Sequence, residues 1–212
     1  MNLALGMALF LNGWRIAYFC IEIRRVKTEK IVITGGPSTG KTSVVKALEN
    51  RGYCCIHEFI RGMTAAEKED DTSKDFKVNP ILSVEDPAAF NNTLLKGRIA
   101  QYQSIKDTNE KVVFLDRGIP DVHAYMNCFG QPYDEAFEQP AHSFRYDRVL
   151  ILPPWREIYA TDAERFETYE EAVQIFAALE KTYQNFGYET VPVPKGSIAE
   201  RVEFILDLVN RN

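Results

Sequence analysis

The stretch Gly-Gly-Pro-Ser-Thr-Gly-Lys-Thr-Ser at residues 35–43 decides the fold class of this chain. It matches the pattern G-x-x-x-x-G-K-[ST], in which successive backbone N–H groups surround a phosphate chain. Gly35 and Gly40 carry no Cβ, so the backbone can curl around one anion without steric conflict. The β-branched run KIVIT at residues 30–34 predicts a buried strand before the loop, and residues 42–50 predict a helix after it. This strand–loop–helix context is typical of a phosphate-binding loop, or P-loop.

The side chains of the P-loop suit a nucleoside triphosphate that is bound together with Mg²⁺. We expect Lys41 to lie across the β- and γ-phosphates and the Thr42 hydroxyl to reach the metal. The helix that opens at Lys41 adds the positive end of its dipole. The loop therefore predicts a nucleotide site. The residues expected to form it are Gly35, Gly36, Pro37, Ser38, Thr39, Gly40, Lys41, Thr42 and Ser43.

Short apolar runs alternate with helical patterns along the rest of the chain. Further strands are predicted at residues 53–57, 111–115, 148–152 and 190–193. Helices are predicted at residues 88–105, 121–129 and 167–186, and a last helix is capped by Ser197. Strands that are apolar throughout belong to sheets that are covered on both faces. The sequence therefore predicts an α/β fold, a P-loop NTPase with a five-stranded parallel sheet and helices on both faces.

The composition excludes several classes of protein. With 212 residues, of which 45% are hydrophobic, the chain can form one domain with a sizeable core and is not disordered. Its net charge of −5 argues against nucleic acid as a partner, because proteins that bind the phosphate backbone usually carry the opposite charge. The four cysteines form no C-x-x-C pair, and with three histidines they argue against a zinc enzyme. Reduced cysteines and a cytoplasmic location are expected.

The N-terminal segment, residues 1–28, is an apolar extension that we separate from the P-loop domain at residues 29–212. Asn12, Arg15 and Glu22 interrupt the apolar run, which argues against a membrane-spanning helix. Three interpretations stay open: an extension that precedes the native start, an extra helix packed on the domain, and a weak membrane anchor.

The predicted strand at residues 111–115 is followed directly by Asp116 and Arg117. An acidic residue at the carboxyl end of a strand beside a P-loop is placed to hold Mg²⁺, usually through water. The alternative is that Asp116 only caps the next helix. Arg117 lies at the same edge of the sheet, where it can meet a substrate anion or pair with a neighbouring acid.

Four stretches together resemble one group of P-loop proteins: ITGGPSTGKT, HEFIR, FLDRGIPDVHAY and PPWREIYATDAER. The group includes the ribosylnicotinamide-kinase domain of a bifunctional NAD-biosynthesis regulator and the AAA-labelled domains of TRP-translocation-defect proteins. The similarity covers residues 30–209, and thymidylate and deoxynucleoside kinases are more distantly similar. The resemblance implies a nucleoside-monophosphate-kinase-like sheet with a mobile lid, which uses ATP and Mg²⁺.

The resemblance also implies roles for residues outside the P-loop. Glu58 and Arg61 match an E-x-x-R pattern whose acid binds or deprotonates the acceptor hydroxyl; the alternative is an exposed ion pair. Arg165 matches the lid arginine that closes over the transferring phosphate, although a solvated surface charge is the alternative for it and more so for Arg156. Arg98 is interpreted as a surface residue; the alternative is that it lines the acceptor pocket.

Two further segments have expected places. Trp155 is interpreted as a packing residue at the base of the lid. The loop at residues 193–196 is implied to lie near the adenine.

The leading functional hypothesis is an ATP-dependent phosphotransferase that acts on a small, nucleoside- or nucleotide-like acceptor. Lys41, Glu58, Arg117 and Arg165 are its expected catalytic residues, and Thr42 and Asp116 its metal ligands. The alternative is a nucleotide-dependent switch or ATPase that acts through a protein partner. A Ras-like GTPase is disfavoured because no [NT]-K-x-D motif is present. The acceptor and the oligomeric state stay open at this point.

Overall fold

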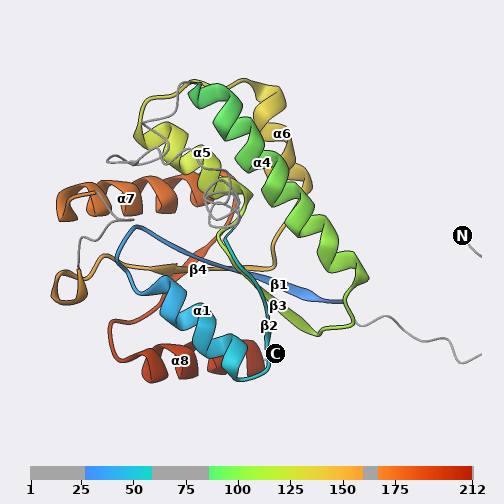
Figure 1. Ribbon diagram of the computed structural model, residues 1–212. Coiled ribbons are helices and arrows are strands. Elements are labelled where there is room, and N and C mark those ends of the chain that lie inside the picture. The colour runs from blue at the N-terminus through green and yellow to red at the C-terminus, as the bar shows by residue number, and fades with distance from the viewer. Residues whose placement is uncertain (1–26, 59–85, 160–166, 212) are drawn as a thin grey trace, which may run out of the picture.

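The computed structural model describes residues 27–58, 86–159 and 167–211. Its centre is a parallel sheet with the strand order β2-β3-β1-β4-β5 (Figure 1). β1 lies in the middle, where Ile31 pairs with Phe114 on one side and with Arg148 on the other. The strands are β1 (Glu29–Gly35), β2 (Cys54–Ile56), β3 (Val112–Asp116), β4 (Arg148–Leu152) and β5 (Thr190–Pro192).

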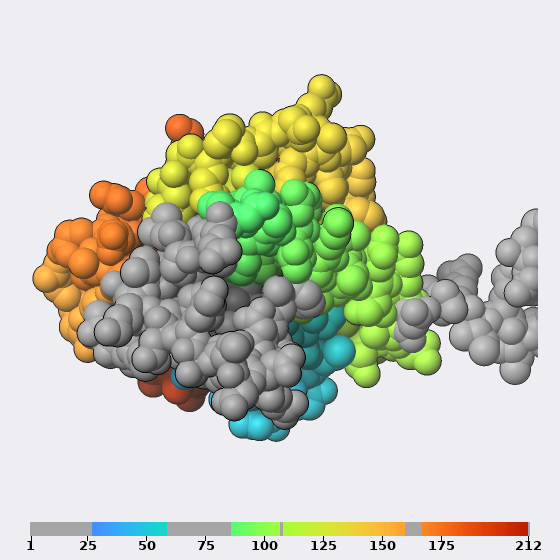
Figure 2. Space-filling view, turned by 45° about the horizontal axis from the view of Figure 1, so that its top comes forward, coloured from blue at the N-terminus to red at the C-terminus, as the bar shows by residue number. Residues whose placement is uncertain are grey.

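Helices cover both faces of this sheet (Figure 1). One face carries α1 (Lys41–Asn50) and α8 (Ile198–Asn210). The other carries α4 (Pro87–Ser104), α5 (Ile119–Cys128), α6 (Glu135–Ser143) and α7 (Tyr169–Asn185), and short 3₁₀ turns lie at Ile105–Asp107 and Arg156–Ile158. Figure 2 shows α4 lying against the segment of α5 and α6 on one side of the molecule.

The strands divide their side chains between two apolar cores because successive residues of a strand point to opposite faces. Ile31 and Ile33 of β1 pack with Val44 and Leu48 of α1 on one face. Val32 points to the other face and joins the core beneath α4, α5 and α7. All three β1 side chains are fully buried, so the sheet is fixed from both sides.

The structure confirms the predicted fold class. Each predicted strand is present within two residues of its expected ends, and all the strands run parallel. α6 was not expected, because Pro140 lies inside it and proline normally interrupts a helix. Its start is fixed by Asp134, whose side chain accepts a hydrogen bond from the Phe137 N–H at 2.9 Å.

The described residues include no helix with the length and apolar character needed to cross a bilayer. Most of the N-terminal extension, residues 1–26, lies outside them, as do residues 59–85 with Arg61 and residues 160–166 with the predicted lid arginine Arg165.

Candidate nucleotide-binding and phosphoryl-transfer site

The P-loop connects β1 to α1 at the carboxyl edge of the sheet. Gly35 ends β1 so close to β4 that a Cβ on it would lie 2.8 Å from the Leu152 carbonyl oxygen. Gly40 has a left-handed backbone, with φ of 78°, and stands directly before the first residue of α1. It has no side chain to cap the helix, so an anion in the loop can serve as the partner of the first-turn N–H groups.

Lys41 and Asp116 meet at the centre of the site. The Lys41 ammonium group forms an ion pair with the Asp116 carboxylate, and the two side chains are 6% and 3% exposed. The pair forms because β3 lies next to β1, which brings the ends of both strands to the same edge. The predicted phosphate ligand and the predicted metal ligand are therefore in contact.

Glu58 lies just beyond this ion pair. Its Oε2 atom is 3.9 Å from Lys41 Nζ, and its Oε1 atom is 2.6 Å from Arg117 Nε. The side chain is only 10% exposed, so the alternative of an exposed acid is wrong for Glu58. Gln101 of α4 supports the segment, since its side-chain amide donates a 2.7 Å hydrogen bond to the carbonyl of His57.

Arg117 has an unusual backbone conformation for its position. Its φ is 74°, in the left-handed region that costs an L residue about 1–2 kcal/mol. Its guanidinium is bound by Glu58, by Asp121 at 3.1 Å and by the Gly35 carbonyl at 3.3 Å. Burial opposes the charge, but Glu58, Tyr125 and Asp121 outweigh that effect and hold the pKa of Arg117 well above its usual range. Of the two alternatives for Arg117, a substrate contact and a salt bridge, the structure shows the salt bridge. Its partner, Glu58, is itself an acid of the site.

Asp121 holds Arg117 in place from α5. Its Oδ1 atom accepts hydrogen bonds from the Thr34 hydroxyl at 2.6 Å and from Arg117, and its Oδ2 atom accepts from the Tyr183 hydroxyl at 2.6 Å and the Gly118 N–H at 2.9 Å. Thr34 and Tyr183 are fully buried, and Asp121 is 2% exposed. Four donors fix this carboxylate, so it links the sheet, α5 and α7 behind the site.

The interpretation of Arg98 as a surface residue is wrong. Its side chain is 3% exposed, donates to the Asp116 carbonyl at 3.1 Å and lies 3.6 Å from Glu58. The helical spacing contained the signal, because Arg98 lies four residues after the buried Leu94 and three after Leu95. α4 therefore turns Arg98 towards the sheet and into the site.

The structure describes Arg156 but not Arg165. Arg156 pairs with Glu170 at 2.8 Å, and both side chains are about 70% exposed, as expected for a solvated surface charge. Arg165 and Arg61 lie outside the described residues. Their roles stay predictions.

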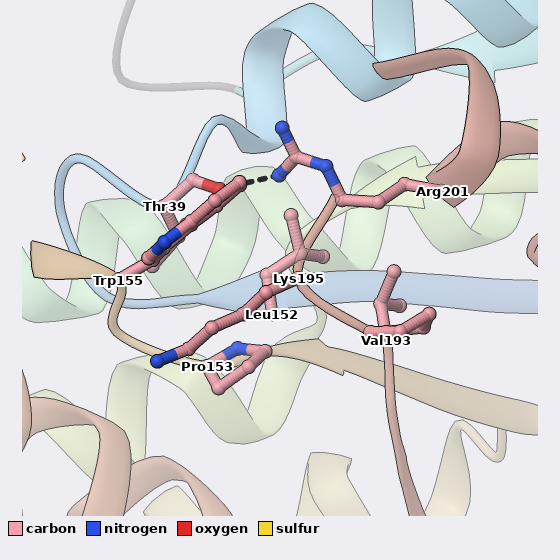
Figure 3. A pocket seen from close by; sticks show the side chains of 8 residues that line it. Thr39, Leu152, Pro153, Trp155, Val193, Lys195 and Arg201 are labelled. Atoms are coloured by element: carbon pink, nitrogen blue, oxygen red, sulfur yellow. Dashed lines mark hydrogen bonds between the residues drawn. The ribbon is translucent and has the colours of Figure 1, made fainter. Parts of the chain in front are cut away.

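A pocket lies beside the P-loop (Figure 3). Its walls come from the ends of β4 and β5, from the P-loop and from α8. They are formed by Thr39, Leu152, Pro153, Trp155, Val193, Pro194, Lys195 and Arg201. The loop that was expected near the adenine therefore lines a pocket that touches the P-loop. Arg201 was not recognised from the sequence, although its spacing of four residues from the buried Ile205 predicts an inward side chain.

The residues present suit a magnesium ion. Thr42 supplies a hydroxyl and Asp116 a carboxylate, which are the hard oxygen donors that Mg²⁺ prefers alongside water and phosphate. In the described parts of the chain no three His, Cys, Asp or Glu side chains gather as a self-sufficient metal site. Mg²⁺ sites at bound phosphates use only one or two protein carboxylates together with water and phosphate oxygens.

The sequence matches the AAA domain family over residues 30–201. The chain belongs to this family. The match covers the P-loop, every strand of the sheet and α8 as far as Arg201. A search of curated proteins finds no match.

Solved structures with the same fold include a deoxyadenosine kinase, a thymidylate kinase and a NadR protein. A deoxyadenosine kinase from M. mycoides with the products dCMP and dCDP is 17% identical, with a TM-score of 0.60 over 86% of this chain and 100% of its own. A thymidylate kinase from Candida albicans is 16% identical, with a TM-score of 0.60 over 86% of this chain and 91% of its own. A NadR protein in complex with NR is 20% identical, with a TM-score of 0.59, and 88% of this chain matches 52% of that one. At these identities the likeness establishes the fold and confirms the resemblance drawn from the motifs.

Proposed function

We propose that this protein is a kinase that transfers the γ-phosphoryl group of ATP to a hydroxyl group of a nucleoside-like small molecule. The observation that carries the proposal is the position of Glu58, whose carboxylate lies 3.9 Å from the P-loop lysine. A carboxylate at this place can accept the proton of an attacking hydroxyl next to the γ-phosphate. A hydrolase can use a carboxylate at this place to activate water, so a transfer assay is what separates a kinase from an enzyme that only hydrolyses ATP.

The P-loop residues have the task of binding ATP. Residues 35–43 enclose the phosphates with backbone N–H groups, and Lys41 exchanges its contact with Asp116 for one with the β- and γ-phosphates. Thr42 and Asp116 would hold Mg²⁺, which neutralises charge on the triphosphate when it is bound. We assign the nucleotide base to the pocket lined by Trp155 and Val193.

The reaction itself uses the residues around Glu58. The acceptor oxygen forms a bond to the γ-phosphorus while the bond from that phosphorus to the β,γ-bridging oxygen breaks, and ADP leaves. Glu58 takes the proton of the acceptor hydroxyl. Arg117, fixed by Asp121, and Arg165 from the proposed lid supply positive charge to the phosphoryl oxygens in the transition state.

A hydroxyl acceptor is favoured over a phosphate acceptor by charge. The Glu58 carboxylate would repel an incoming monophosphate, whereas it forms a hydrogen bond with a hydroxyl group. Arg98 is already engaged with Glu58 at 3.6 Å, and Arg117 is assigned to the transferring phosphoryl group, so neither offsets the charge of a second phosphate. Among the neighbours of the same fold, the deoxyadenosine kinase is named for a nucleoside acceptor and the thymidylate kinase for a nucleotide acceptor, so the fold alone does not decide between the two.

The test is a phosphoryl-transfer assay with γ-labelled ATP and Mg²⁺ against nucleosides, ribosylnicotinamide and nucleoside monophosphates, in which labelled acceptor is counted separately from free phosphate. We expect stoichiometric transfer to one class of hydroxyl acceptor. Release of free phosphate at the same rate with every acceptor, and without labelled acceptor, would contradict the proposal. It would support a nucleotide-dependent switch that acts through a protein partner.

Two matched variants test the role of Glu58. Glu58→Gln should lower transfer by about 10²- to 10³-fold, the usual contribution of a general base, and change ATP affinity by less than about threefold. Glu49→Gln is the control, because Glu49 is a half-exposed carboxylate that pairs with His57 at 3.2 Å and not with a residue of the Lys41–Asp116 pair. Equal transfer by the two variants would show that Glu58 is not the base.

Two wider assignments complete the proposal. We take residues 29–212 as the catalytic domain and the cytoplasm as its location. Free thiols at Cys54, Cys55 and Cys128 are compatible with a reducing compartment in which ATP is abundant.

A further inference from the structure

Arg201 is a buried cation without an acidic partner in the described parts of the chain. The side chain is 6% exposed and extends from α8 towards the P-loop (Figure 3). Its Nη1 atom donates a 2.9 Å hydrogen bond to the carbonyl of Thr39, while its Nε atom is buried and unpaired. Burying a guanidinium without a counter-charge costs several kcal/mol, so a fold that keeps one needs an anion or a π surface from elsewhere.

The pocket in which Arg201 lies has the chemistry of a site for a flat anion. Leu152, Pro153 and Val193 supply apolar surface, and Trp155 supplies an aromatic ring. Its charged side chains are the two cations Lys195 and Arg201, and no lining residue is acidic. A ligand with an aromatic base and a phosphate chain matches these walls.

Trp155 and Arg201 face one another across this pocket. The Arg201 Cζ atom is 5.6 Å from the centre of the Trp155 ring, which is a cation–π distance. A base inserted between them needs about 7 Å, twice the contact distance of about 3.5 Å between stacked atoms. The 5.6 Å between the Arg201 Cζ atom and the Trp155 ring centre is shorter than this, so the two side chains must move apart to admit a base.

The same guanidinium also touches the P-loop. Besides its bond to Thr39, it packs against Gly40, where a Cβ would lie 3.0 Å from Nη1 and Nη2. Gly40 is the residue that turns the loop into α1. One side chain therefore contacts both the phosphate loop and the pocket beside it.

We propose that Arg201 is a nucleotide-recognition residue, which stacks on the base of the bound triphosphate and joins the base pocket to the P-loop through Thr39. The proposal rests on the nucleotide site of the proposed function and adds a residue that distinguishes a nucleotide from a bare phosphate chain. Because the guanidinium is fixed on the P-loop side, the base and the phosphates are positioned by one rigid group.

The experiment compares ATP with inorganic tripolyphosphate, which has the phosphates but no base. Binding of each with Mg²⁺ is measured by calorimetry for the full chain, for Arg201→Gln and for Arg201→Lys. Arg145→Gln is the matched control, because Arg145 also donates to a carbonyl, that of Phe186 at 2.6 Å, and lies 3.8 Å over the ring of Tyr188. We expect Arg201→Gln to weaken ATP by about tenfold and tripolyphosphate by less than about threefold, with no change for Arg145→Gln.

The outcomes separate this proposal from the proposed function. Equal losses for ATP and tripolyphosphate would overturn the stacking role, since they would show that Arg201 supports only the P-loop. Unchanged ATP affinity in both Arg201 variants would overturn it as well. A wild-type chain that binds neither ligand would overturn the nucleotide site itself, and this proposal with it.

A measurement without any change at Arg201 covers the case in which its variants fail to fold. The chain has two tryptophans, so replacing Trp14 by Phe leaves Trp155 as the fluorescent reporter. ATP should quench Trp155 and tripolyphosphate should not. Binding of ATP that leaves Trp155 fluorescence unchanged would overturn the proposal.

Discussion

The ammonium group of Lys41 is bound to the carboxylate of Asp116 in a pair that is more than nine-tenths buried. The first residue is the expected partner of the β- and γ-phosphates, and the second is the expected ligand of Mg²⁺. This ion pair must break before Lys41 can bind phosphate and Asp116 can bind metal. We expect the metal and the triphosphate to bind together, because the phosphates then replace the lost partner of Lys41 and the metal replaces the lost partner of Asp116.

Asp116→Asn should remove this linkage. The neutral amide releases Lys41, so Mg²⁺-free tripolyphosphate should bind about tenfold more tightly than it binds to the wild-type chain. The gain from adding Mg²⁺ should shrink, since a carboxylate ligand is lost. Calorimetry with and without EDTA measures both effects. Unchanged affinity for the metal-free ligand would show that the ion pair does not oppose phosphate binding.

Arg165→Ala and Arg156→Ala form a second matched pair. If Arg165 supplies charge to the transferring phosphoryl group, its loss should lower kcat by about 10²- to 10³-fold and leave ATP affinity nearly unchanged. Arg156→Ala should retain turnover within about twofold, because Arg156 makes an exposed pair with Glu170. Steady-state kinetics on the best acceptor decides between the two. Similar effects of both changes would remove Arg165 from the catalytic assignment.

Gly118→Ala should destabilise the fold by steric crowding alone. The backbone of Gly118 has an ordinary φ of −116°, but an added Cβ would lie 2.7 Å from the Tyr183 hydroxyl and 3.0 Å from the Tyr146 ring. We expect a loss of about 1–3 kcal/mol in the free energy of unfolding, measured by urea denaturation. In Gly118→Ala with Tyr183→Phe, the loss should be smaller than the sum of the single losses, because the hydroxyl in closest contact is gone. Additive losses would contradict this crowding.

The raised pKa of Tyr125 leads us to expect a lower free energy of unfolding at alkaline pH. Burial raises the pKa of its phenol from 10.0 to about 12. Below pH 10 the neutral phenol is present in both states, so its contribution is constant; above pH 10 the unfolded chain loses the proton first, and stability falls until the pH passes the folded pKa. At pH 11 the loss from this residue alone is about 1.4 kcal/mol.

The measurement is the free energy of unfolding in urea between pH 9 and pH 11.5. Other groups with raised pKa values, such as the buried phenol of Tyr146 and the half-buried thiol of Cys55, add to the slope. The share of Tyr125 is therefore the difference in slope between the wild-type chain and Tyr125→Phe. Parallel curves for the two proteins would contradict the assignment.

Local patterns in the sequence were sufficient for the fold and for the P-loop. Apolar runs such as Val112–Asp116 predict buried strands, and the spacing of glycines and Lys41 predicts the loop between strand and helix. α6 was missed for a local reason, since Pro140 is a poor residue for a helix interior.

The contacts of the site depend on strand order, which no local pattern contains. Glu58 meets Arg117 because β2 lies beside β3, and Lys41 meets Asp116 because β3 lies beside β1. Arg98 and Arg201 were missed for a different reason. Arginine is rarely buried, so the residue type favours a surface position even where the helical spacing favours a buried one.

The charges gathered around Glu58 have a consequence for how fast a nucleotide arrives. Lys41, Arg98 and Arg117 lie among the carboxylates of Glu58, Asp116 and Asp121, so this cluster of described residues is balanced within a chain of net charge −5. Such a cluster projects little field into the solvent and does not by itself steer anions from a distance. The rate of association with Mg·ATP should therefore vary little with ionic strength. We expect the nucleotide to reach the site by unassisted diffusion. Lys41 and Asp116 then exchange their mutual contact for contacts with the phosphates and the metal.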